Sequence, residues 1–164
     1  MNKITYIVLL ILIPLCAFSA SNQSSFEIYL VKNDNADLQQ VEIYSKPILT
    51  AADIMKYDWN KHEIVLTNKG LRKLPKENDT TVLGKSFVVI ANGIRCYKGT
   101  FWTSIWSVSH PNPIINIGPR LEGRSKNIIS IERAYPSENF AIGPDPRNNN
   151  LIYKALFELN KIHE

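Results

Sequence analysis

The sequence contains little of three residue types on which catalytic and metal chemistry often depends. Its 164 residues include only two cysteines, three histidines and seven glycines. The histidines are His62, His110 and His163, which lie 48 and 53 residues apart. Pairs of metal ligands usually lie within a few residues of each other, so this spacing excludes a recognisable metal motif. We expect neither a metal site nor a cofactor.

The chain also has little excess charge of either sign. It carries 19 Lys and Arg against 15 Asp and Glu, a formal charge of +4. Nucleic-acid binding usually needs a basic stripe on a strongly basic domain, so no nucleic-acid partner is expected. With 45% apolar, 10% aromatic and 21% charged residues, the composition is neither disordered nor collagen-like. The length is that of one globular domain.

The first twenty residues differ from the rest of the chain. Lys3 gives a positive start, residues 4–15 are almost entirely apolar, and small residues follow up to Ala20. This pattern is typical of a secretory signal peptide, and the apolar run is shorter than the roughly 20 residues needed to cross a bilayer. We therefore predict a signal peptide over residues 1–20, export to the periplasm or extracellular space, and no transmembrane segment after cleavage.

Two alternatives concern the same segment. Cys16 could carry a lipid, although the large Leu15 stands where lipoprotein signals have a small residue. The segment could also stay uncleaved as an anchor. If Cys16 leaves with the signal, Cys96 is alone and no internal disulfide can form, so stability must come from the core. Loss of Lys3 would leave a mature chain with a formal charge of +3.

Residues 21–25 form a polar tether, and residues 26–164 are predicted to be a single α+β domain with a mainly antiparallel or mixed sheet. Runs rich in β-branched and aromatic residues predict strands. These runs are residues 26–32, 62–67, 86–91, 94–97, 113–117 and 127–133. Thr50 and Thr67 can each cap a short helix, the first reaching Tyr57 and the second ending at Pro75.

Asn92-Gly93 predicts a two-residue hairpin turn, because both residues tolerate positive φ. The expected register pairs Ala91 with Ile94 and Val89 with Cys96, which puts Cys96 on the same face as Val89.

A C-terminal helix packed on the sheet is predicted from Asp145-Pro146, a favoured helix start. Apolar residues follow at spacings of three and four, which predicts one buried stripe. They are Leu151, Ile152, Ala155, Leu156, Leu159 and Ile162. Lys161 and His163 are expected in its last turn.

An aromatic cluster is the strongest candidate binding surface. It consists of Tyr97, Phe101, Trp102 and Trp106, with Ile105 between them. Exposed amphipathic aromatics are common in binding surfaces, so the hypothesis is that this cluster rims a peptide or protein contact. The alternative is that the same side chains pack in the core.

No residue is predicted to be catalytic. Cys96 and His110 could act as nucleophile and base, but a cysteine on an apolar strand face usually behaves as a small hydrophobe. Acidic residues such as Asp53, Asp58 and Asp145 stand near caps and turns, where they are expected for structural reasons.

A basic stripe of Lys69, Arg72, Lys73 and Lys76 follows helical spacing after Thr67. It could contact an anionic membrane or wall surface, and the alternative is a solvated helix face.

Residues 26–117, a little over half of the chain, resemble the head subdomain of the first periplasmic domain of SecD, a subunit of the protein-export machinery. The shared pieces are residues 26–31, 47–54, 67–71 and 87–97. The chain also looks like small exported proteins with a turn of the type Tyr57-Asp58-Trp59. The resemblance implies a ferredoxin-like α+β head that works as a mobile, non-catalytic binding module. The tail from Asn127 has no counterpart in it.

Together these features predict a non-catalytic binding or accessory module of the bacterial cell envelope, with a protein or peptide partner. The alternative is a small envelope hydrolase whose site residues are too scattered for the sequence to show.

Overall fold

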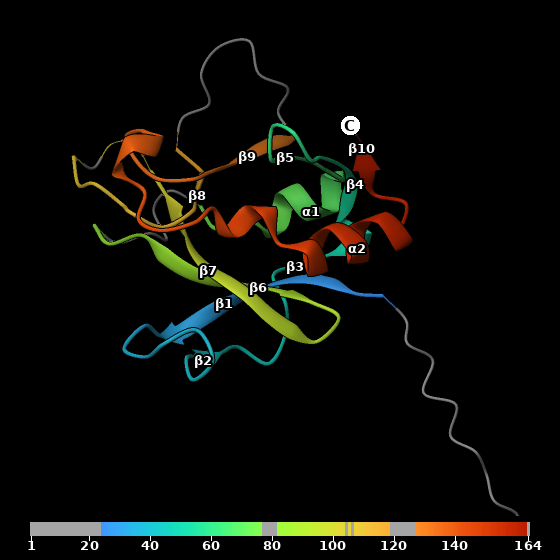
Figure 1. Ribbon diagram of the computed structural model, residues 1–164, viewed down its shortest axis with the longest axis horizontal. Helices are drawn as coiled ribbons and strands as arrows, with labels where there is room; N and C mark the ends of the chain where they lie inside the picture. The colour runs from blue at the N-terminus through green and yellow to red at the C-terminus, as the bar shows by residue number, and fades with distance from the viewer. Residues whose placement is uncertain (1–23, 77–81, 104, 106, 119–126, 164) are drawn as a thin grey trace, which may run out of the picture.

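The computed structural model describes residues 24–76, 82–103, 105, 107–118 and 127–163. They form an α+β domain with a mixed sheet and a C-terminal helix, which confirms the predicted fold class (Figure 1). No helix within these ranges is long and apolar enough to cross a membrane. The predicted signal peptide, Cys16 and Trp106 lie outside the described residues.

The elements follow one another along the chain as short strands with few helices. The strands are β1 (Phe26–Asn33), β2 (Glu42–Ile43), β3 (Leu49–Thr50), β4 (Ile54–Asp58), β5 (Glu63–Leu66), β6 (Lys85–Ala91), β7 (Ile94–Trp102), β8 (Ile114–Asn116), β9 (Ile128–Glu132) and β10 (Ile162–His163). The α-helices are α1 (Asn68–Lys73) and α2 (Asn150–Glu158). Short 3-10 turns are η1 (Ala51–Asp53), η3 (Glu138–Phe140) and η4 (Pro146–Asn148).

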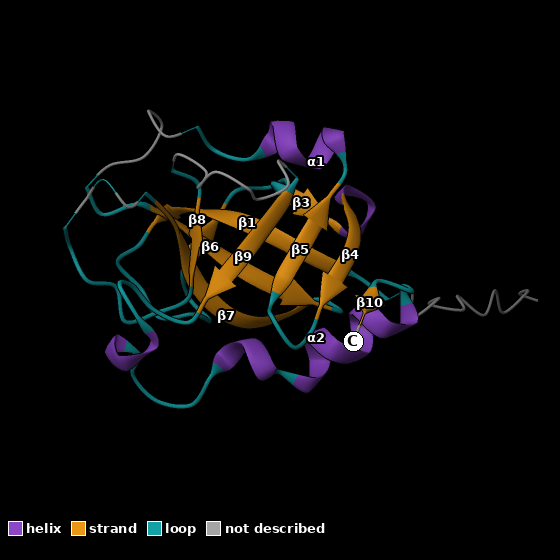
Figure 2. Cartoon of the chain, turned by 90° about the horizontal axis from the view of Figure 1, so that it is seen from above, coloured by secondary structure: helices purple, strands orange, loops and turns teal. Residues whose placement is uncertain are grey.

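The sheet is long and folds over itself. Its strand order is β10-β4-β5-β9-β8-β7-β6-β1-β2, with β3 paired to β1. Among the strand pairs of the described residues, only β7–β8 and β10–β4 are parallel. In Figure 2, β4, β5 and β9 cross over β1, β6 and β7, so the sheet has two facing halves. The short strand β8 pairs with both β7 and β9 and joins the halves. This element order is longer than the β-α-β-β-α-β of a ferredoxin-like domain.

One hydrophobic core fills the space between the two halves. It includes Ile28 from β1, Phe87 from β6, Ile64 from β5 and Leu156 from α2, all fully buried. The two α-helices lie on opposite sides of the crossed strands (Figure 2). Helix α2 packs into the core through Ile152, Ala155 and Leu156, as its apolar stripe predicts.

The hairpin between β6 and β7 confirms the predicted turn but corrects the predicted register. Asn92 and Gly93 have φ angles of 50° and 76°, as a two-residue turn of this kind requires. Ala91 pairs with Ile94, but Val89 pairs with Tyr97 instead of Cys96. The register shifts because Cys96 is the extra residue of a β-bulge, and the bulge puts Tyr97 on the buried face beside Val89.

The helix predicted from Thr50 to Tyr57 is wrong beyond Asp53. The expected capping contact forms, with the Thr50 N–H donating to Asp53 Oδ2 at 3.0 Å, but it closes only η1. The chain then becomes β4, because pairing with β5 buries Ile54 and Tyr57 against the core. The second short helix, α1, is confirmed, with Thr67 Oγ1 accepting from the Gly70 N–H at 3.0 Å.

The C-terminal segment is divided into more pieces than expected. Asp145 caps η4 by accepting from the Arg147 N–H at 3.0 Å, and α2 has its own cap, Asn149. Asn160, with φ of 54°, ends the helical course. Ile162 and His163 are therefore in β10 beside β4, and not in a last helical turn.

Candidate functional site

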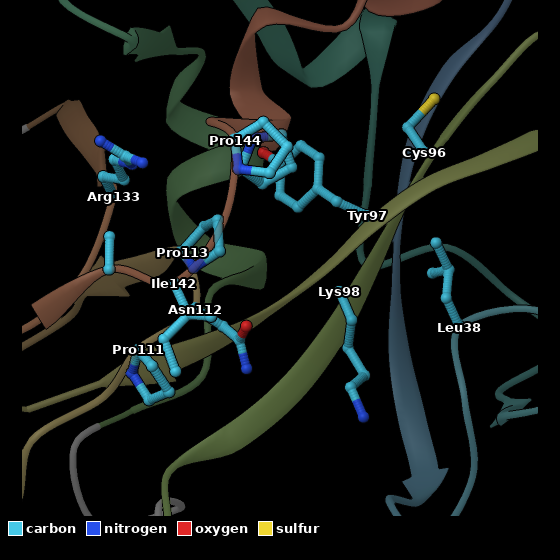
Figure 3. A pocket seen from close by; sticks show the side chains of 12 residues that line it. Leu38, Cys96, Tyr97, Lys98, Pro111, Asn112, Pro113, Arg133, Ile142 and Pro144 are labelled. Carbon is cyan, nitrogen blue, oxygen red and sulfur yellow. The ribbon is translucent and has the colours of Figure 1, made fainter.

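An open cleft of about 300 Å³ is the candidate site. One wall is strand β7 at Cys96, Tyr97 and Lys98. The opposite wall carries Arg133, Ile142 and two Pro-x-Pro segments, Pro111-Asn112-Pro113 and Pro144-Asp145-Pro146, whose four prolines line the cleft. Figure 3 shows β7 on one side and Pro113, Pro144 and Arg133 facing it. The volume of the cleft lies at the lower end of the range for ligand sites, which is roughly 300–1,000 Å³.

A buried arginine holds the loop that forms the opposite wall. Arg147 is 7% exposed. It donates from Nη1 to the Ile131 carbonyl at 2.7 Å and from Nη2 to Asp145 Oδ2 at 2.6 Å and Glu138 Oε1 at 3.1 Å. These bonds tie the residues around Pro144 and Pro146 to strand β9. The wall is thus fixed before any ligand arrives.

The same contacts perturb the ionisation of Asp145. Burial by itself would raise the pKa of Asp145, but the hydrogen bonds and charge of Arg147 outweigh it and hold the pKa below its usual value. Asp145 and Arg147 are therefore a charged pair that is devoted to the loop.

The charged side chains that line the cleft are both cations. Lys98 Nζ lies 2.6 Å from Asp34 Oδ1, so that charge is partly balanced. Arg133 donates from Nη2 to the Gly143 carbonyl at 2.7 Å and makes no ion pair with any described residue. No Asp or Glu lines the cleft in the part of the chain that the structure describes. The walls are apolar with a positive bias.

The aromatic cluster predicted as a binding surface is mostly interior. Tyr97 is 4% exposed, and Phe101 and Trp102 are fully buried, so the core-packing alternative describes these three. The bulge at Cys96 turns Tyr97 inward, and Phe101 packs on Phe87 with ring centroids 4.9 Å apart. Tyr97 nevertheless contributes to the cleft wall. Ile105 is 57% exposed.

Cys96 and His110 do not form a nucleophile and base pair in the described structure. The Cys96 thiol is half-buried at the cleft, and burial raises its pKa, which disfavours the thiolate. The His110 ring packs on Trp102, with ring centroids 4.9 Å apart, and burial lowers the pKa of His110. No hydrogen bond links the two side chains among the described residues.

The remaining candidate groups have structural contacts. Lys73 Nζ lies 2.6 Å from Asp53 Oδ2, so the basic stripe on α1 is interrupted by an ion pair. The Tyr57 hydroxyl and His62 Nδ1 lie 3.2 Å apart, and both side chains are buried. Within the described ranges, no three His, Cys, Asp or Glu side chains gather where they could hold a metal.

The sequence contained a signal for the cleft that residue-by-residue reasoning missed. Two Pro-x-Pro segments stand 33 residues apart, at 111–113 and 144–146. Proline has no backbone N–H, so neither segment can continue a strand ladder, and both fit at the boundary of a sheet. The structure brings the two segments to the same cleft.

The fold and the cleft together define a class: an α+β protein with an open, apolar, positively biased cleft at the edge of a sheet strand. Comparisons of the chain with protein-family models, with curated proteins and with solved structures give no match. The resemblance to the SecD head therefore stays a prediction.

Proposed function

We propose that this protein is a non-catalytic binding module of the bacterial cell envelope and that its partner is a protein or peptide segment. The observation that carries the proposal is the cleft beside β7, with its preformed walls and apolar lining.

Apolar side chains at the mouth of the cleft favour a macromolecular partner. Ile142 is 79% exposed and lines the cleft, and Phe140, two residues earlier, is 48% exposed. Covering such side chains is favourable by roughly 25 cal/mol for each Å² of apolar surface removed from water. A peptide segment lying in the cleft would cover Ile142 and the proline rings together.

The cleft supports binding better than hydrolysis. The only thiol among the described lining residues is that of Cys96, and burial disfavours its reactive thiolate. The envelope location rests on the predicted signal peptide and on the SecD resemblance.

Site-specific photo-crosslinking in living bacteria that produce the full chain would test the proposal. A photoreactive residue at position 142 is expected to give discrete, reproducible adducts in the envelope fraction. Met55, which is 59% exposed on β4 and does not line the cleft, is the matched control position. Adducts at both positions, or at neither, would contradict a binding role for the cleft. Recovery of the protein in the cytoplasmic fraction would contradict the proposed envelope location.

A further inference from the structure

The hydrogen-bond pattern of β7 shows which backbone groups face the cleft. The Thr100 N–H donates to the Pro113 carbonyl at 2.9 Å, and the Trp102 carbonyl accepts from the Ile117 N–H at 2.8 Å. Residues 100 and 102 thus point their backbone groups away from β6. Because this direction alternates along a strand, the N–H and C=O of Lys98 point to the same edge.

The ladder stops at Lys98 because its neighbour has no donor. In a parallel pair with this register, residue 113 would donate to the Lys98 carbonyl, but that residue is proline. Before Pro113 the chain also turns away from β7, since His110 pairs with Tyr135 through two backbone bonds of 2.9 Å. Beside Lys98 the edge of β7 is therefore left to the cleft.

The wall across the cleft cannot complete the ladder either. Pro144 and Pro146 lack N–H groups, and Arg147 fixes their loop to β9. Prolines beside a strand edge commonly protect it from indiscriminate pairing, and the bulge at Cys96 restricts the usable edge to a few residues. A short edge of β7 therefore remains beside Lys98, with the prolines and the bulge on either side, and it has room for one added strand.

We propose that the cleft binds an extended, acidic peptide segment of a partner protein as an added β-strand beside Lys98. This inference rests on the proposed function and specifies its binding mode. Strand addition satisfies the backbone groups of Lys98, while alternate peptide side chains point to the proline-lined wall or to solvent. The positive bias of Arg133 and Lys98, with no lining carboxylate, selects acidic side chains. Arg133 contributes more to this selection, because Lys98 is already paired with Asp34.

Peptide titrations with the full chain would test the binding mode. The probe is an end-blocked peptide of about seven residues that alternates valine and glutamate, a length that suits strand addition. Two matched peptides carry N-methyl groups on alternate residues, one on the odd positions and one on the even positions. A third has lysine in place of glutamate. The peptide whose methyl groups stand on the amides that face β7 should bind at least about tenfold more weakly, which corresponds to about 1.4 kcal/mol. The lysine peptide should lose a similar factor. The amide signals of residues 97–99 should shift with the unmodified peptide and with the peptide whose methyl groups face away from β7.

Two protein variants locate the charge preference. Arg133→Gln should weaken binding of the glutamate peptide roughly three- to fivefold, as expected for a partly exposed charge pair, and should strengthen binding of the lysine peptide, because a repelling charge is removed. Lys61→Gln is the matched control, because Lys61 is an exposed cation that does not line the cleft.

The outcomes separate this inference from the proposed function. Equal affinity for methylated and unmethylated peptides would refute strand addition and leave the cleft as a binding site. No binding of the glutamate peptide would refute an acidic extended ligand, whatever the crosslinking result. Absence of crosslinks at position 142 would refute the proposed function itself.

Discussion

The two halves of strand β7 have different neighbours. Thr100 and Phe101 pair with β6 on one side and β8 on the other, and their side chains are at most 4% exposed. Tyr97 and Lys98 pair with β6 alone, and their other edge meets the cleft.

The difference between the halves originates outside β7. Ile114 begins β8 and continues the ladder, whereas Pro113, one residue earlier, cannot donate to it. One residue thus marks the boundary between the closed half and the open half of the strand. A binding edge can therefore arise from the neighbour's chemistry, without any special sequence in the strand itself.

The largest expected effect breaks the closed half. Phe101→Ala removes a fully buried ring that packs on Phe87, and we expect a loss of about 3–5 kcal/mol in the free energy of unfolding. Urea denaturation measures the change. The control is Ile94→Ala at the start of β7, where the side chain is 50% exposed and the loss should be well under half as large. Similar losses for both variants would mean that the two halves are equally packed.

The next effect concerns the wall that faces the open half. Arg147→Met removes the bonds to Ile131, Asp145 and Glu138 and leaves the largely buried Asp145 carboxylate unpaired. We expect a loss of roughly 3 kcal/mol in the free energy of unfolding and weaker binding in the cleft. Thermal and urea unfolding measure the first, and peptide titration the second.

The matched control for Arg147 is Lys61→Met, which breaks an exposed ion pair with Asp58 at 3.6 Å. That change should cost less than about 1 kcal/mol. If both variants are equally stable, Arg147 does not hold the wall.

A smaller effect is a pH dependence on the closed side. His110 packs on Trp102, and burial lowers the pKa of His110 in the folded state despite a hydrogen bond with the Leu83 backbone. As the pH falls from about 7 through the unfolded-state pKa of about 6.5, the unfolded chain takes up this proton first. The free energy of unfolding should therefore fall until the folded-state pKa is passed.

Urea denaturation across pH 5–8 measures how steeply the free energy of unfolding changes with pH. This dependence should be shallower in His110→Gln than in the unmodified protein. His62 has a lowered pKa of the same origin and should keep part of the slope. An unchanged slope in His110→Gln would assign the whole dependence to other groups.

The smallest effect on stability sharpens the open half. Ile142→Ser changes a side chain that is 79% exposed, so the free energy of unfolding should stay within about 0.5 kcal/mol. Binding in the cleft should nevertheless weaken, because the apolar contact at its mouth is lost. A substantial loss of stability would show that Ile142 packs on the domain, and unchanged binding would exclude it from the contact.

Local signals in the sequence predicted much of this fold. The Asn92-Gly93 turn, the Thr67 cap and the alternating residues of β1 all depend on near neighbours, and each is found where it was expected. The segment after Asp53 was assigned wrongly because tertiary pairing with β5 overrode a good capping signal. The register at Cys96 was missed because nothing in the hairpin's own sequence marks a bulge.

The cleft depends on contacts that sequence reasoning could not place. Pro113 and Pro144 belong to distant segments, and only the folded sheet brings them to one site. Composition alone marks the aromatic cluster as a candidate surface, but the layers around β7 decide its exposure, and they bury Phe101 and Trp102 completely. Short-range patterns thus predicted the elements, and long-range packing decided the site.

The position of α2 has a consequence for how the protein is made. Ile152, Ala155 and Leu156 complete a core whose other members begin at Phe26. A nascent chain that ends before residue 150 therefore leaves the part of this core that α2 covers exposed to water. The domain should therefore reach its protease-resistant state only after α2 has left the ribosome.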